Sequence, residues 1–142
     1  MDKSLFDLVQ DVKRVCIFTE DRIRNEFDLS YVEFMALHLL NPNEKLTGSE
    51  FSERMKFSNA RGSRVVNQLY KKGLVETTIL PNNRRTIEIA LSKSGCKLKK
   101  EIDKEITKCE TKILDSLKPD ARKSLKMSLE ILSGLLIETQ KK

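Results

Sequence analysis

The sequence is poor in several residue types on which specialised folds and enzymes depend. Its 142 residues include no Trp, one His, three Cys, three Pro and five Gly. Few Gly and Pro argue against a sheet-rich fold and favour long helices. Three widely spaced cysteines argue against a disulfide scaffold and favour a reducing compartment. One His, with no metal-ligand spacing and no phosphate-binding glycine loop, gives no basis for a catalytic, metal or cofactor site, so we do not expect an enzyme.

Long apolar runs are also missing. No stretch approaches the length that crosses a bilayer, and the first residues carry acidic side chains instead of the pattern of a secretory signal. We therefore expect a cytoplasmic protein without a membrane partner and, from its length, a single domain over residues 1–142. Charged residues are abundant at 34%, and the formal net charge of +6 is compatible with a polyanionic partner.

Apolar residues recur at helical spacing in both terminal regions. One stripe covers residues 4–27, and two more lie in residues 93–140 on either side of a break at Pro119, a residue favoured at the first position of a helix. These apolar faces are broader than one small domain can cover. They predict dimerisation helices at about residues 4–27 and 93–140.

Helix-start signals divide the region between them. Ser30 is placed to cap a helix over residues 30–40, and Thr47 and Glu50 have the spacing of a capping box. After a tight turn, Ser58 is placed to cap a helix that runs to Lys72, with Gly73 at its end.

The period then changes to alternation. Residues 75–79 and 87–91 alternate across a basic segment, 81–85, which predicts a β-hairpin with Arg at its tip. Two short helices followed by such a hairpin have the order of a winged helix-turn-helix. We therefore predict a mainly α fold with a small β-hairpin wing, in which a winged helix-turn-helix at about residues 30–92 is flanked by the dimerisation helices.

The second of the two short helices has the composition of a DNA-reading helix. Residues 54–73 contain six basic side chains and no acidic one, and Val65, Val66 and Leu69 can pack inward. Arg and Asn on the other face can pair with guanine and adenine in a major groove, and wing arginines suit an adjacent minor groove. The candidate DNA-binding residues are Ser58, Asn59, Ala60, Arg61, Ser63, Arg64, Asn67, Lys71, Lys72, Asn83, Arg84 and Arg85.

The segment from Leu46 to Ile102 resembles the MarR family of regulators. Its landmarks are Leu46-Thr47, Arg64, Leu69, Lys72-Gly73-Leu74-Val75, Pro81, Arg84-Arg85, Leu91 and Gly95. The resemblance implies a homodimer that represses from a palindromic double-stranded DNA operator, and a small-molecule effector whose pocket would lie near Cys16 and His38. The sequence departs from the family at Asn83, where Asp is usual, at Thr77, where Arg is common, and at Gly62, where a β-branched residue usually packs. The glycine predicts a locally soft recognition helix.

Simpler interpretations remain beside these. A winged helix without sequence-specific DNA binding could serve as a protein-interaction or dimerisation module. Cys16 and Cys109 are expected to be buried as small apolar residues, and Cys96 to be exposed and inert. The acids interleaved in the following helix predict that its lysines are solvated: Lys97, Lys99, Lys100, Lys104, Lys108 and Lys112.

Overall fold

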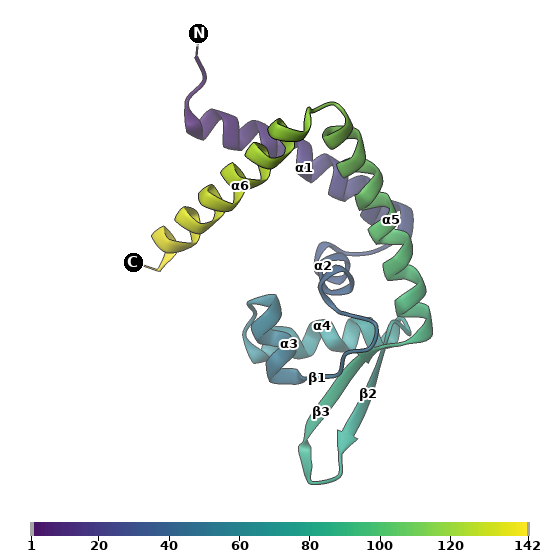
Figure 1. The fold of residues 1–142 in the computed structure, drawn as a ribbon. Helices are drawn as coiled ribbons and strands as arrows, with labels where there is room; N and C mark the ends of the chain where they lie inside the picture. Colours follow the sequence, from purple (N-terminus) through teal and green to yellow (C-terminus); the bar gives the residue numbers. More distant parts are fainter. Residues whose placement is uncertain (1, 142) are drawn as a thin grey trace. The chain divides into compact units, whose positions relative to one another are not determined.

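The computed structural model describes residues 2–141, apart from the side chains of residues 17, 18 and 83–85. Six helices and three strands lie in this part of the chain (Figure 1). The helices are α1 Leu5–Phe27, α2 Tyr31–Leu39, α3 Gly48–Met55, α4 Asn59–Lys71, α5 Lys93–Asp115 and α6 Pro119–Gln140. The strands are β1 Leu46–Thr47, β2 Val75–Leu80 and β3 Asn83–Leu91. The expected mainly α fold with a small β-hairpin is confirmed.

Helices α2, α3 and α4 begin where the capping residues predict. Ser30 and Thr47 each form a capping box, with Glu33 and Glu50 respectively, and the Ser58 hydroxyl accepts a hydrogen bond from the backbone N–H of Arg61. These caps satisfy amide groups that have no partner inside their own helix.

A residue with left-handed backbone conformation follows each of α1, α3 and α4. Asp28, Lys56 and Gly73 have positive φ, and the N–H of the residue after each one reaches back five residues to a carbonyl. Only at Gly73 does this conformation have no steric cost from a side chain, because glycine has no Cβ.

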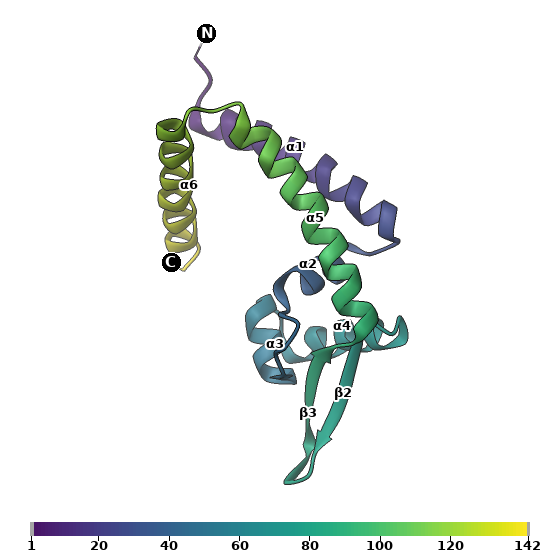
Figure 2. The same cartoon turned by 45° about the vertical axis from the view of Figure 1, so that its right-hand side comes forward.

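The three strands form one antiparallel sheet in the order β1-β3-β2. In β2 and β3, Val75 pairs with Leu91 and Ile79 with Ile87, but the register shifts between Ile79 and Leu80. Leu80 pairs with Asn83, so the turn contains only Pro81 and Asn82. The predicted five-residue tip is therefore too long, because strand pairing continues beyond it. The hairpin projects away from α2, α3 and α4 in two views (Figures 1 and 2).

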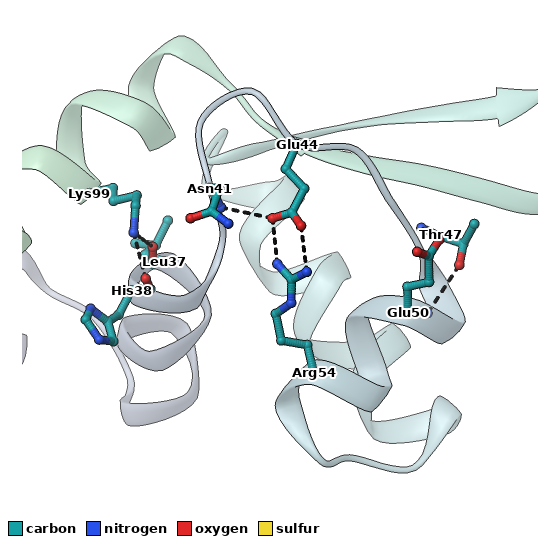
Figure 3. Close-up of polar contacts among 8 residues, drawn as sticks. All are labelled: Leu37, His38, Asn41, Glu44, Thr47, Glu50, Arg54 and Lys99. Atoms are coloured by element: carbon teal, nitrogen blue, oxygen red, sulfur yellow. Dashed lines mark hydrogen bonds and ion pairs between the residues drawn. The ribbon is translucent and has the colours of Figure 1, made fainter. Parts of the chain in front are cut away.

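The winged helix-turn-helix at about residues 30–92 is called the winged region below. The core lies where the sheet meets the helices of this region. Its largest fully buried side chains are Phe51, Ile23, Leu37, Leu69, Ile89 and Ile102. Lys99 contradicts the expectation of solvated lysines on α5, because it is only 9% exposed. Its ammonium donates to the carbonyls of Leu37 and His38 at 3.2 and 2.6 Å and so completes the C-terminal end of α2 (Figure 3).

Residues 1–103 and 104–142 form two compact units. In the second unit the Arg122 Nε donates to the carbonyls of Leu114 and Leu117, which fixes the turn between α5 and α6. No residue of α6, all of which is described, is buried. Within residues 2–141 no helix combines the length and the apolar content that a membrane span requires.

The cysteines lie in other environments than the sequence predicts. Cys16 is exposed and Cys109 is half-buried, where burial was expected, and Cys96 is half-buried instead of exposed. Cys16 belongs to the first part of α1, where Leu5, Phe6, Val12 and Val15 are also exposed.

Candidate nucleic-acid interface

Helix α4 has one face in the core and one face in solvent. Val65, Val66 and Leu69 are buried against the rest of the winged region, as predicted. Most of the predicted DNA-binding residues lie on or next to this helix, and they are exposed: Ser58, Asn59, Ala60, Arg61, Ser63, Arg64, Asn67, Lys71 and Lys72. The helical fold therefore brings these residues onto a continuous surface, which we call the α4 face.

The turn before α4 sets the position of Arg61. Its Cζ atom lies 4.1 Å from the centroid of the Phe57 ring, which is within the range of a cation–π contact. Its backbone N–H donates to the Ser58 hydroxyl at 3.2 Å. Both the main chain and the side chain of Arg61 are thus held at the start of the helix.

Lys72 has a structural role that the sequence did not predict. Its ammonium donates to the carbonyl of Asp28 at 2.9 Å and lies 3.1 Å from the Glu33 carboxylate. Burial opposes ionisation of Glu33, but hydrogen bonds from Ser30 and Lys72 outweigh it and hold the pKa of this carboxyl below its usual value. Lys72 therefore joins the end of α4 to the start of α2.

Gly62 lies at a close approach between α3 and α4. A Cβ at this position would come 1.9 Å from the Oγ of Ser52, a buried residue of α3. The sequence predicted softness here, whereas the structure gives the glycine a packing reason, because the two helices could not approach this closely around a larger residue.

Arg54 is occupied by a neighbouring loop. Its guanidinium makes a two-pronged contact with Glu44, at 2.5 and 2.6 Å, and this contact lowers the pKa of the Glu44 carboxyl (Figure 3). The absence of acids between residues 54 and 73 therefore does not leave every basic group of this segment available. The unopposed positive charge is concentrated on α4 itself.

A pocket of about 530 Å³ separates α4 from the wing. Its polar lining comes from Asn59 and Ser63 of α4, Ser49 of α3, and Thr47 and Thr86 of the sheet. Sequence reasoning found Asn59 and Ser63 but missed Ser49 and Thr86, because only the pairing of β1 with β3 brings the start of α3 beside the wing.

Five predicted site residues lie away from the α4 face. Asn83, Arg84 and Arg85 begin β3, and their side chains lie outside the described residues. Of the two candidate pocket residues, Cys16 is exposed on α1, and the Nδ1 atom of His38 lies 3.3 Å from Asp103. His38 therefore contacts a carboxylate of α5, and no described contact joins it to Cys16.

The order of α2, α3, α4 and a β2–β3 hairpin, together with an outward basic second helix, defines a winged helix-turn-helix protein. The profile of the MarR family matches residues 29–87, which contain all of this unit up to the middle of β3. This match falls largely within the segment from Leu46 to Ile102 and the helix before it, and it supports the resemblance found in the sequence.

Known proteins resemble most of the chain. YwaE of Bacillus subtilis (strain 168), described as an uncharacterized HTH-type transcriptional regulator, is 26% identical over 130 residues, which are 92% of this chain and 72% of that protein. The structure of a Staphylococcus aureus MepR–DNA complex has a TM-score of 0.78 at 19% identity, with 94% of this chain and 99% of that chain covered. NadR in complex with 4-hydroxyphenylacetate has a TM-score of 0.70 at 21% identity, with 93% of each chain covered.

Proposed function

We propose that the chain is a sequence-specific, double-stranded-DNA-binding transcriptional regulator that acts as a homodimeric repressor on a palindromic operator. In this proposal α4 enters the major groove and the wing lies along the adjacent minor groove. The chain binds and does not catalyse, and it acts in the cytoplasm because its partner is DNA.

The exposed, acid-free and cationic α4 face is the observation that carries this proposal. Arg61 and Arg64 can each make paired hydrogen bonds to guanine, and Asn67 can do so to adenine. Lys71, at the end of the helix, is placed for a phosphate contact, which would fix the position of the protein without reading sequence. MepR, whose fold is similar, has been solved with DNA, and this supports the same partner here.

A second copy of the chain is proposed because the apolar faces of α1 and α6 are exposed. The first part of α1 exposes Leu5, Phe6, Leu8, Val12 and Val15, and α6 exposes seven large apolar residues between positions 125 and 137. Contiguous apolar surfaces of this kind are typical of permanent interfaces. A two-fold dimer would present two α4 faces, which accounts for a palindromic target.

Selection of bound sequences from random DNA tests the proposal. Wild type should select a palindrome, and Arg61→Ala should relax preference at one base position in each half-site, at a cost of about 1–3 kcal/mol on the preferred site. Lys71→Ala should weaken all sequences alike and reduce the slope of log affinity against log salt by about one unit. Lys112→Ala, which removes an exposed charge from α5, is the matched control and should leave both quantities unchanged.

The protein-interaction alternative predicts a different result in the same experiment. A module that does not read DNA would select no consensus and would show shallow salt dependence. If wild type, Arg61→Ala and Arg64→Ala select an identical consensus, α4 does not read the DNA sequence. The assignment of a winged-helix fold would be unaffected.

The wing and the effector are separate parts of the proposal. Arg85 is assigned to the minor groove and Arg84 to a phosphate, so Arg85→Ala should weaken specific binding by about 1–3 kcal/mol. Asn83→Asp should strengthen binding if the wing arginine lacks an orienting carboxylate.

A small-molecule effector is proposed because NadR, with a similar fold, was solved with 4-hydroxyphenylacetate; titration with small aromatic acids should then reduce operator affinity.

A further inference from the structure

The contact between Phe57 and Arg61 joins a residue outside the α4 face to one within it. Phe57 precedes the helix cap, and its ring lies 4.1 Å from the Arg61 Cζ atom. No acidic residue occurs between positions 54 and 73 to pair with this guanidinium along the chain. The Arg61 side chain instead contacts the aromatic ring of Phe57.

The backbone fixes Phe57 on both sides. Lys56, the residue before it, adopts a left-handed conformation that ends α3, and the Phe57 N–H donates to the carbonyl of Ser52 at 2.8 Å. Ser58, the residue after it, caps α4 through the N–H of Arg61. The half-buried ring is thus anchored in a turn that both helices determine.

Stacking on a ring restrains an arginine without using its hydrogen-bond donors. A guanidinium stacked on a ring presents its flat face to the ring, so its N–H groups stay in the plane and form a fork that matches the O6 and N7 acceptors of guanine. A restrained fork loses less conformational freedom on binding than a mobile one.

We propose that Phe57 is a positioning residue for DNA reading: its ring holds the Arg61 guanidinium in the orientation that reads one base pair in each half-site. This inference rests on the proposed function. Phe57 itself needs no contact with DNA, and it acts through Arg61.

Two substitutions distinguish the aromatic character of Phe57 from its apolar volume, and they test the proposal. Phe57→Leu keeps an apolar side chain and removes the aromatic face, and Phe57→Tyr keeps the face. Because a cation–π contact at an exposed site contributes about a 2–5-fold effect, Phe57→Leu should weaken operator binding about 2–5-fold and relax the base position that Arg61→Ala relaxes. Phe57→Tyr should restore both quantities. Tyr70→Leu, which removes an exposed aromatic ring elsewhere on α4, should leave them unchanged.

A double-variant cycle separates positioning from general stability. In the Arg61→Ala background, Phe57→Leu should cause no further loss of affinity or preference, because the residue through which Phe57 acts is gone. A further loss equal to that in the wild-type background overturns the proposal, as does a Phe57→Leu variant with wild-type affinity and consensus. If Arg61→Ala leaves the consensus unchanged, the assigned role of Arg61 fails first and that of Phe57 fails with it.

NMR spectra of the wild-type protein without DNA give a test that needs no variant to fold. In wild type, the Arg61 side-chain protons should show ring-current shifts in NMR spectra because of the ring 4.1 Å from Cζ. The same shifts should persist in Phe57→Tyr and disappear in Phe57→Leu. Unshifted Arg61 resonances in wild type would overturn the proposal.

Discussion

The winged region and the terminal helices place their apolar side chains in opposite environments. In the winged region Leu69 and Ile89 are fully buried within one chain. In α6, Leu135 is 60% exposed and Leu136 is 50% exposed. The contrast even occurs within α1, whose Leu5 is exposed and whose Ile23 is buried. The winged region therefore completes its core within one chain, with Ile23 of α1 and Ile102 of α5, whereas α6 and the first part of α1 need another surface to stabilise them.

The largest effect is expected from charges placed on the apolar face of α6. Leu132 and Leu136 line an apolar pocket of about 550 Å³ on this helix. Leu132→Asp with Leu136→Asp should abolish dimerisation and operator binding, because a buried unpaired charge costs several kcal/mol. Sedimentation should give about twice 16.4 kDa for wild type and 16.4 kDa for the variant. Glu130→Lys, outside the lining of this pocket, is the control and should remain dimeric; a dimeric double variant would contradict the comparison.

Replacing a glycine with alanine should change the free energy of unfolding in opposite directions in the two regions. Gly62→Ala places a Cβ 1.9 Å from the Ser52 Oγ and should lower the free energy of unfolding by about 1–3 kcal/mol, as overpacking does. Gly134→Ala in α6 meets nothing within 4 Å and should raise it by about 1 kcal/mol, the usual difference in helix propensity. Urea unfolding of the two variants measures both values. Unchanged or raised stability of Gly62→Ala would show that α4 is not tightly packed on α3.

The Glu33–Lys72 pair should make the winged region sensitive to acid. Because the pKa of Glu33 in the folded chain is lowered, its contribution to stability is complete above its ordinary pKa of 4.5 and disappears as the pH falls through the lowered value. Glu33→Gln keeps a hydrogen-bond acceptor for Ser30 but loses the charge, so it should cost about 1–2 kcal/mol at pH 7. Unfolding curves of the variant should also depend less on pH below 4.5. Glu110→Gln, on an exposed part of α5, should follow wild type at every pH.

Sequence reasoning succeeded where the signal is local and failed where the partners are distant in the chain. The caps Ser30, Thr47 and Ser58 were predicted correctly, because each lies three residues from the amide or side chain that completes it. The contact of Lys99 with α2 spans more than sixty residues, and no periodicity within α5 distinguishes this lysine from its solvated neighbours. Strand β1 was also missed, since two residues are too few to alternate.

The candidate site shows the same division. The burial of Val65, Val66 and Leu69 followed from helical periodicity, and so did the exposure of the residues opposite them. The engagement of Lys72 by Glu33 did not follow, because it depends on where α2 packs against α4. A basic residue on a predicted binding face therefore becomes a candidate contact only after its partners within the fold are known.

The smallest effect concerns the turn that joins α3 to α4. Lys56 has a φ of 59°, a conformation that places its Cβ close to the backbone and costs about 1–2 kcal/mol for a residue with a side chain. Lys56→Gly should remove most of this cost, and the greater freedom of glycine in the unfolded chain should offset part of the gain, which leaves a rise of about 0.5–1 kcal/mol in the free energy of unfolding. Lys71→Gly is the matched control, because the same replacement in the last turn of α4 should lower stability by about 1 kcal/mol. Urea unfolding measures both, and NMR ring-current shifts on Arg61 should be retained in Lys56→Gly, since the substitution keeps the backbone conformation that anchors Phe57. Destabilisation by Lys56→Gly would mean that the lysine side chain makes a contact whose contribution exceeds the backbone cost.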